Sequence, residues 1–226
     1  MKHWKALNVV LLFGIGTIIL STCTSAGKAG LGPSPLFSQP SMSVIVQLPD
    51  DGRRETAFTA YPVAEAEAKK WNRDALLYQI PVNRIMEINL GIPSGIPGWF
   101  FMFKVPNSAV EYYIKVVNGQ ISGVTEAQPI LLQELPYELL PIEIRELRLD
   151  SDDVLRLFIE FGGKQYIETH PYWQIDYRLV HLKGQPHPVW SLFDVSNINQ
   201  PPLFNVDAVT GEIVADPFLS LAHVHK

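Results

Sequence analysis

The chain has 226 residues, 47% of them hydrophobic, and a formal net charge of -5 at pH 7. This acidic balance argues against a nucleic-acid-binding protein, whose binding surface would have to be basic. Eighteen prolines and many Tyr and Phe residues favour strands with irregular connections over a helical bundle.

The first 22 residues predict a bacterial signal peptide. Lys2 and Lys5 supply a positive start, residues 9–20 an apolar core, and Ser21-Thr22 a small-residue cleavage region before Cys23. This cleavage region resembles a lipobox, the sequence that a lipoprotein signal peptidase recognises. We therefore expect the Cys23 thiol to carry diacylglycerol and its new amino group an acyl chain such as palmitate, which together give stable membrane attachment.

Two other interpretations of this segment remain open. Residues 6–22 approach the length of a membrane-spanning helix, and an ordinary signal peptide with an incidental cysteine would also fit. All three interpretations place the rest of the chain outside the cytoplasm, which agrees with the single cysteine of the sequence. Residues 23–42 are rich in Ser, Gly, Pro and Ala, and we expect them to form a lipid-anchored flexible tether.

Residues 43–141 are expected to form the first of two half-copies. Their apolar residues recur at helical spacing over 63–80. Strand-like runs follow at 84–90, 99–105 and 112–117. Asn118-Gly119 separates the last of these from residues 120–124, which is the strongest hairpin signal in the chain.

Residues 142–226 are expected to form the second half-copy. It opens with a helix over 152–160, with Asp150 or Ser151 as its N-cap and Gly162-Gly163 at its end. Strands are expected at 173–182, where apolar and polar residues alternate most clearly, and at 189–195, 203–207 and 212–215. Both copies then share a short helix, a strand that begins with Trp and a strand that ends in a glycine turn, with an insertion near 183–200 in the second.

The second copy resembles the PepSY and PepSY-like domains of bacterial secreted and membrane proteins. The resemblance lies in the strand at 173–177 and in the ending at 204–214, which contains Asp-Ala-x-Thr-Gly-Glu, and it covers about residues 149–216. The first copy is a degenerate relative that keeps Trp99 and Asn118-Gly119. The resemblance implies an α+β fold of two PepSY-like halves, each a helix packed on a small antiparallel sheet. The alternative is a single α+β domain.

The ending of the second copy predicts a turn on its own terms. The Asp207 side chain can accept hydrogen bonds from turn amides, and Gly211 can take a positive φ where Glu212 re-enters the sheet. PepSY domains are regarded as binding or inhibitory modules, found in propeptides of secreted metalloproteases and in envelope proteins. The resemblance therefore implies a binding role and supplies no catalytic residues.

Metal and hydrolase chemistry find little support in the sequence. Four histidines suggest a metal site but lack further ligands at suitable spacing: His181, His187, His223 and His225. Three acidic residues fit a helix cap and its solvated face: Asp150, Asp152 and Asp153. No hydrolase motif or phosphate-binding glycine loop occurs, so we expect no metal, no cofactor and no enzymatic activity. A cleft that brought Asp176, His170 and Asp207 together would reverse this expectation.

The sequence favours an extracytoplasmic, lipid-anchored, non-enzymatic binding module of the bacterial cell envelope, on its periplasmic side. It would inhibit or sense an envelope protease or another envelope protein by pairing an exposed sheet edge with an extended segment of that protein. The alternative is a carrier of a small ligand or peptide, with Trp99, Trp173 and Tyr177 on a concave aromatic sheet face. The aromatic run at 99–103 either packs on both faces of a strand or forms an exposed patch.

Replacement of the lipidated residue tests the predicted membrane attachment. Cys23→Ala should release the protein from membranes or leave it unprocessed, because no thiol remains to carry the lipid. Membrane fractionation and the apparent mass of the product measure this. Unchanged retention and size would favour the uncleaved anchor.

Overall fold

The structure is a computed structural model, and it describes residues 48, 52–91, 97–127, 138–170, 174–197 and 200–217. Several predicted features lie outside these residues: the signal peptide, Cys23, the tether, Trp173, His223 and His225. None of the helices in the described part combines the length and the apolar character that crossing a bilayer requires.

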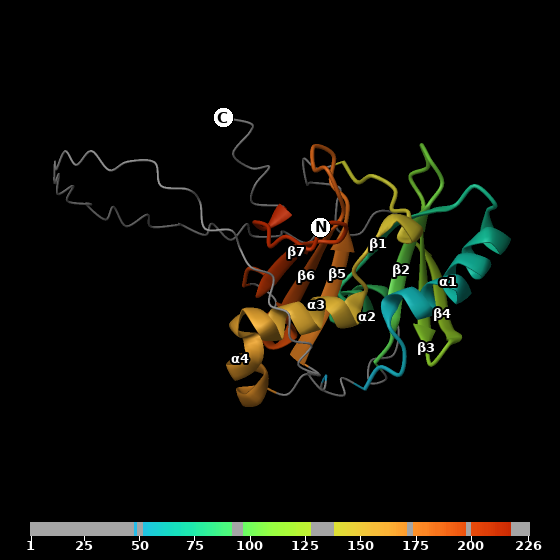
Figure 1. Cartoon of the computed structure of the whole chain (residues 1–226). Coiled ribbons are helices and arrows are strands. Elements are labelled where there is room, and N and C mark those ends of the chain that lie inside the picture. The colour runs from blue at the N-terminus through green and yellow to red at the C-terminus, as the bar shows by residue number, and fades with distance from the viewer. Residues whose placement is uncertain are drawn as a thin grey trace, which may run out of the picture. The chain divides into compact units, whose positions relative to one another are not determined.

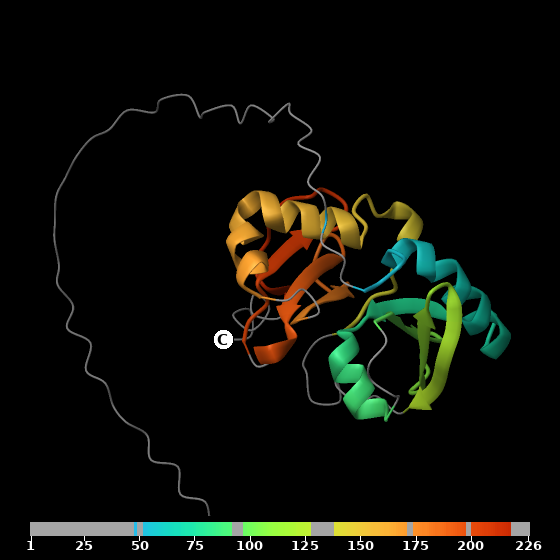
Figure 2. The same ribbon diagram turned by 90° about the horizontal axis from the view of Figure 1, so that it is seen from below.

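The described residues have an α+β fold in which seven strands form one antiparallel sheet, in the order β4-β3-β2-β1-β5-β6-β7 (Figure 1). In chain order the strands are β1 (Leu76–Ile80), β2 (Trp99–Lys104), β3 (Glu111–Val117), β4 (Gln120–Ala127), β5 (Ile175–Val180), β6 (Val189–Asp194) and β7 (Phe204–Asp207). The helices are α1 (Ala57–Trp71), α2 (Asn83–Leu90), α3 (Ser151–Phe158) and α4 (Lys164–Thr169). Helices α1 and α3 cover one face of the sheet, and α2 lies on the other (Figure 2).

The main core lies between the sheet and helices α1 and α3. From β2 it takes Trp99, Phe101 and Phe103, which alternate along the strand and point to the same face. The residues between them, Phe100 and Met102, pack against α2 on the other face. Both faces of this strand are therefore covered, which confirms the core interpretation of the aromatic run.

Helix α1 lies close to the sheet because its buried side consists of alanines. Ala57, Ala60, Ala64 and Ala68 recur every three or four residues and are fully buried. The helix begins earlier than the predicted range of 63–80 because Thr56 caps it, with its side chain accepting from the Thr59 amide. It also ends earlier, because the chain turns to an extended conformation at Asn72. The last part of the predicted helix is strand β1.

Residues 84–90 form helix α2, so the strand predicted there is wrong. The buried residues Asn83 and Met86 are three apart, and Leu90 packs beside Met86, which is helical spacing. Gly91 ends the helix in the left-handed conformation, with φ of 64°.

The remaining elements of the first half agree with their predictions. β2 and β3 cover the expected runs, and Asn118 and Gly119 form the turn between β3 and β4. Both turn residues have positive φ, 50° and 70°, as a two-residue hairpin with the right-handed twist of the strands requires.

The second half keeps its predicted order, with two differences. α3, β5, β6 and β7 lie where expected, and the helix ends as predicted at Gly162-Gly163, because Phe161 and Gly162 leave the helical conformation and Gly162 has φ of 102°. The first difference is that a further helix, α4, follows this kink. The predicted strand at 212–215 reduces to a single bridge, Val206↔Ile213.

One continuous sheet replaces the two small sheets that the resemblance implies. β1 and β5, the first strands after α1 and after α3–α4, pair antiparallel in the middle of the sheet at Gln79↔Val180 and Ile80↔Leu179. Their edges are therefore joined, and residues from both parts of the chain share the main core.

A single carboxylate organises the start of both large helices, whose N-termini meet over the middle of the sheet (Figure 1). Asp150 is the N-cap of α3 and forms a capping box with Asp153. Its carboxylate also accepts hydrogen bonds from the Phe58 amide in the first turn of α1, at 3.1 and 3.3 Å. The Ser151 hydroxyl accepts from the Ala57 amide at 3.2 Å. Both helix N-termini thus gain acceptors, and their positive dipole ends face one negative charge.

Replacement of this carboxylate tests its double role. Asp150→Ala should lower the free energy of unfolding by about 2–3 kcal/mol, because it removes the α3 cap and leaves the Phe58 amide without its acceptor. Asp150→Asn keeps the acceptor oxygen and should restore most of that loss. Urea denaturation measures both. Equal losses for the two variants would contradict the hydrogen-bonding explanation.

Candidate functional site

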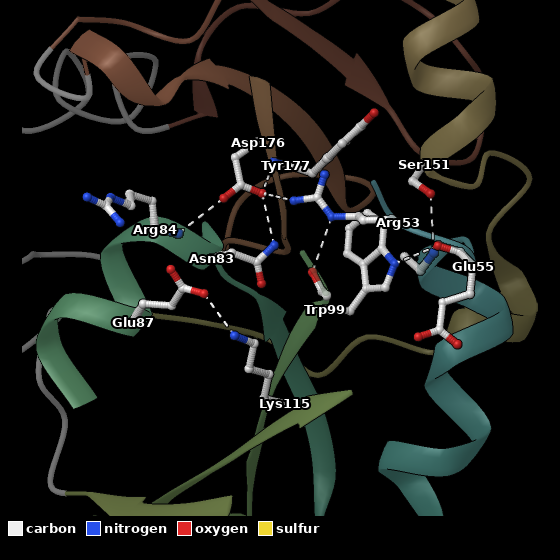
Figure 3. Close-up of polar contacts among 12 residues, drawn as sticks. Arg53, Glu55, Asn83, Arg84, Glu87, Trp99, Lys115, Ser151, Asp176 and Tyr177 are labelled. Atoms are coloured by element: carbon white, nitrogen blue, oxygen red, sulfur yellow. Dashed lines mark hydrogen bonds and ion pairs between the residues drawn. The ribbon is translucent and has the colours of Figure 1, made fainter. Parts of the chain in front are cut away.

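The most densely bonded polar cluster of the described residues surrounds Asp176 of β5 (Figure 3). Its Oδ1 accepts hydrogen bonds from Arg53 Nη2 at 2.7 Å, from Asn83 Nδ2 at 3.0 Å and from the Tyr177 amide at 2.9 Å. Its Oδ2 accepts from the Arg84 amide in the first turn of α2, at 3.2 Å. Asp176, on strand β5, therefore caps the distant helix α2, just as Asp150 provides an acceptor for the start of α1.

Arg53, which precedes α1 in the chain, is the cation of this cluster. Its guanidinium lies over the rings of Trp99 and Tyr177, at 4.8 and 5.2 Å from their centroids. Its Nε donates to the Gly98 carbonyl at 3.2 Å. The side chains of Arg53 and Asp176 are only 8% and 5% exposed, so the ion pair is buried and multiply hydrogen-bonded.

This arrangement can position chain segments but is poorly suited to proton transfer. Both carboxylate oxygens of Asp176 accept hydrogen bonds from groups of the fold itself. A general base needs a lone pair directed at a substrate proton. We therefore interpret the cluster as the structural link between the segment before α1, the start of α2 and strand β5.

A second group of buried charges lies on the α2 face of the sheet. Lys115 Nζ contacts Glu87 Oε1 of α2 at 2.8 Å, and both side chains are nearly buried. The Tyr113 hydroxyl donates to Glu111 Oε2 at 2.6 Å. Burial, and then this hydrogen bond, raise the pKa of Tyr113 above its ordinary value, so the phenol remains a proton donor at neutral pH. The Lys115–Glu87 pair fixes α2 against β3, and the Tyr113–Glu111 hydrogen bond lies within β3.

The predicted turn at Asp207 is confirmed in detail. Asp207 Oδ1 accepts from the amides of Val209 and Thr210, each at 2.8 Å, and Gly211 has φ of 79°. The Oδ2 atom lies 2.9 Å from His187 Nδ1. Burial alone would raise the pKa of Asp207, but hydrogen bonds from Thr210, His187 and Val209 outweigh it and hold that pKa below its ordinary value.

The three residues that would indicate an enzyme do not share a cleft. Asp176 binds Arg53, Asp207 binds His187, and His170 stacks on Tyr166 with ring centroids 4.1 Å apart. Asp207 pairs through Val189 to Val180, four residues along β5 from Asp176 and therefore about 13 Å away along that strand.

Two other predicted sites have the following outcome. Among the described residues, no three His, Cys, Asp or Glu side chains gather as metal ligands. His181 lies near the Gln185 carbonyl, at 3.3 Å, whereas His187 contacts Asp207. Trp99 and Tyr177, expected on the open face of a ligand carrier, are 1% and 3% exposed and pack around Arg53 in the core.

The feature best suited to binding is the outer edge of β4. It is the last strand of the sheet on its side, and no described strand pairs with its outer edge. Ile121 and Val124 are 36% and 44% exposed, and Glu126 is the only charged residue of the strand. The backbone groups that point outward from an edge strand can pair with another extended chain.

The opposite edge of the sheet is covered by the protein itself. The Asp207 amide donates to the Glu212 carbonyl at 2.9 Å, and the Val214 amide donates to the Asn205 carbonyl at 3.1 Å. Residues 212–214 thus occupy the outer side of β7. Of the two edges, β4 is the one that the described chain leaves open.

Sequence reasoning expected an exposed sheet edge without identifying it, because strand order is not visible in a hairpin pattern. Arg53 carried no signal, since its partner Asp176 is 123 residues away. Comparisons with family models, curated proteins and solved structures give no match to this chain.

A double-mutant cycle tests the structural interpretation of the Asp176 cluster. Asp176→Ala should lower the free energy of unfolding by about 3–5 kcal/mol, because it leaves Arg53 buried without its anion. Adding Arg53→Met to this variant should recover part of the loss. Urea denaturation measures the cycle.

Glu138→Gln provides the matched control, since it breaks the equally short but exposed ion pair with Lys183, 2.7 Å, and should cost less than about 1 kcal/mol. Losses of equal size at Glu138 and Asp176 would contradict the importance of burial.

Proposed function

We propose that this chain is an extracytoplasmic, lipid-anchored, non-enzymatic binding module of the bacterial cell envelope. It pairs strand β4 with an extended segment of an envelope protein, such as a protease, and thereby inhibits or senses it. The observation that carries this proposal is the open β4 edge with its exposed Ile121 and Val124. Lipid on Cys23 would hold the module at the membrane.

The internal bonding of the buried charges supports a binding role over a catalytic one. Asp176 with Arg53 and Glu87 with Lys115 are paired within the fold. Catalytic groups are usually left with a free face toward a cleft, where substrate completes their hydrogen bonds. Two exposed apolar residues, Ile121 and Val124, lie instead on an open sheet edge, where backbone pairing supplies affinity.

A duplicated architecture supports the proposed pair of PepSY-like halves, 43–141 and 142–226. In the first half, helix α1 precedes strands β1 to β4, and in the second half, helix α3 precedes strands β5 to β7. In both halves the strands follow one another outward from the middle of the sheet. The indole of Trp99 on β2 donates to the Glu55 carbonyl, just before the N-cap of α1, at 2.9 Å. The indole of Trp190 on β6 donates to the Leu149 carbonyl, just before the N-cap of α3, also at 2.9 Å. In each half, an indole at the start of the second strand is thus bonded to the carbonyl just before the helix N-cap.

This repeated contact changes the alignment of the halves. Trp190, rather than Trp173, is the counterpart of Trp99, and β5 is the counterpart of β1. β6 then lies within the residues assigned to an insertion at 183–200. The two halves share one sheet and one core, so we propose them as halves of a single domain.

Site-specific photo-crosslinking in the native envelope tests the proposed binding edge. A photoreactive residue at Val124 should form an adduct with an envelope protein, mapped by mass spectrometry to one short segment. The matched control site is Ile213, which is 50% exposed but lies beside the covered edge. Adding Ile121→Lys should reduce the Val124 adduct about tenfold, because a charge on an edge strand opposes further pairing.

A second control separates edge pairing from general stickiness. Ile88→Lys removes an apolar residue that is 68% exposed on α2 and should leave the Val124 adduct unchanged. Equal adducts at Val124 and Ile213, or a Val124 adduct insensitive to Ile121→Lys, would refute the proposal.

A further inference from the structure

The open edge has two chemically different sides. Residues that pair directly across a sheet point to the same face. Ile121 pairs with Val116 and Val124 with Ile114, whose side chains belong to the main core beneath α1. Both therefore extend the apolar layer of the α1 face outward, to the rim of the sheet.

The other side of the strand carries small residues. Gly123 pairs with Lys115 and Thr125 with Tyr113, on the face covered by α2. An incoming strand can therefore bury apolar side chains on the α1 face only. Its residues should alternate, with aliphatic side chains at every second position.

The end of the strand adds a charge. Glu126 pairs with Tyr112, on the same face as Val124, and its Oε1 accepts a hydrogen bond from the Trp71 indole at 2.7 Å. The Trp71 ring stacks on Tyr112 with centroids 4.7 Å apart, which holds the carboxylate in place.

Of the two carboxylates near Tyr112, only that of Glu67 has an ion-pair partner among the described residues. The nearby carboxylate of Glu67 lies 2.7 Å from Lys70, whereas Glu126 makes no ion pair with any described residue. Burial raises the pKa of Tyr112, the charges of Glu67 and Glu126 raise it further, and the charge of Lys70 lowers it, which agrees with both carboxylates and the Glu67-bound lysine lying near that ring.

We propose that the segment bound by β4 runs antiparallel to it and contains a Lys or Arg followed, at the second and fourth positions after it, by aliphatic residues. The cation faces Glu126, and the aliphatic side chains lie beside Val124 and Ile121. This inference rests on the proposed function and specifies its partner. On the inner edge of β4, strand β3 already pairs in this way: Tyr112, Ile114 and Val116, each two residues apart, lie opposite Glu126, Val124 and Ile121. All six pairs of neighbouring strands in the described sheet are antiparallel.

Charge distinguishes this partner from a second copy of the chain. Two β4 strands paired about a two-fold axis would supply the aliphatic row, but β4 contains no Lys or Arg to face Glu126. The same pairing would bury part of Glu126 without a counter-charge, which is unfavourable. A segment with a cation and alternating aliphatic residues complements both the aliphatic row and the charge of Glu126.

Binding of labelled peptides to the full chain in detergent micelles tests this inference by fluorescence anisotropy. The probe contains Lys-Thr-Val-Thr-Val between threonines. The comparison peptides replace Lys by Glu, reverse the order, or cluster the two valines. The Lys probe should bind about two- to fivefold more tightly than the Glu peptide at low salt, the range expected of an exposed ion pair. This difference should vanish near 1 M salt, where the screening length is about 3 Å.

Glu126→Gln supplies the matched variant, since its side-chain oxygen can still accept the Trp71 hydrogen bond. It should abolish the preference for Lys over Glu without weakening the Glu peptide, while Glu168→Gln on α4 should change nothing. Equal binding of the Lys and Glu peptides, stronger binding of the reversed or clustered peptide, or dimerisation that depends on Ile121 would each overturn the inference. Absent peptide binding with a persistent Val124 adduct would overturn the partner chemistry alone. Absence of both would overturn the proposed function as well.

Discussion

The pairing of β1 with β5 is the contact on which the rest of the structure depends. It joins the two parts of the chain through only two paired positions, Gln79↔Val180 and Ile80↔Leu179. Such a short ladder is weak by itself, and other segments close it at both ends. At one end, residues 138–142 lie between the diverging strands, with the Ile142 amide donating to Leu77 and the Leu140 amide to His181.

The buried Asp176 cluster closes the other end of this ladder. Asn83 follows β1 and Asp176 begins β5, and their side chains are hydrogen-bonded at 3.0 Å. Arg53 adds the segment before α1 to the same carboxylate. A slip of β5 by one residue would turn Asp176 to the opposite face and leave Arg53 buried without its anion. The ion pair therefore opposes alternative registers in a sheet whose central ladder is too short to do so.

Local signals in the sequence predict the parts of the fold that local chemistry decides. The Asn118-Gly119 hairpin, the Asp150 cap and the Asp207 turn each follow from residues within a few positions of one another. The sequence predicts a helix where β1 lies and a strand where α2 lies. Short apolar runs fit the helical and the strand period equally well, so the packing of the rest of the fold decides between them. The partnership of Arg53 with Asp176 could not be predicted, since it exists only after the sheet has formed.

Joining two small sheets into one also determines which sheet edges remain open. Two separate sheets would have four edges, whereas the joined sheet has two, since β1 and β5 cover each other. Residues 212–214 cover β7, so β4 is the open edge within the part of the chain that the structure describes. A natural edge strand is commonly protected by lysines, prolines or a covering segment. β4 has an irregularity near Ser122, but its exposed side chains include Ile121 and Val124 and it contains no lysine or proline. Among the described residues, this edge is the one that lacks both of these protections, and it is therefore the edge to which we assign the proposed binding.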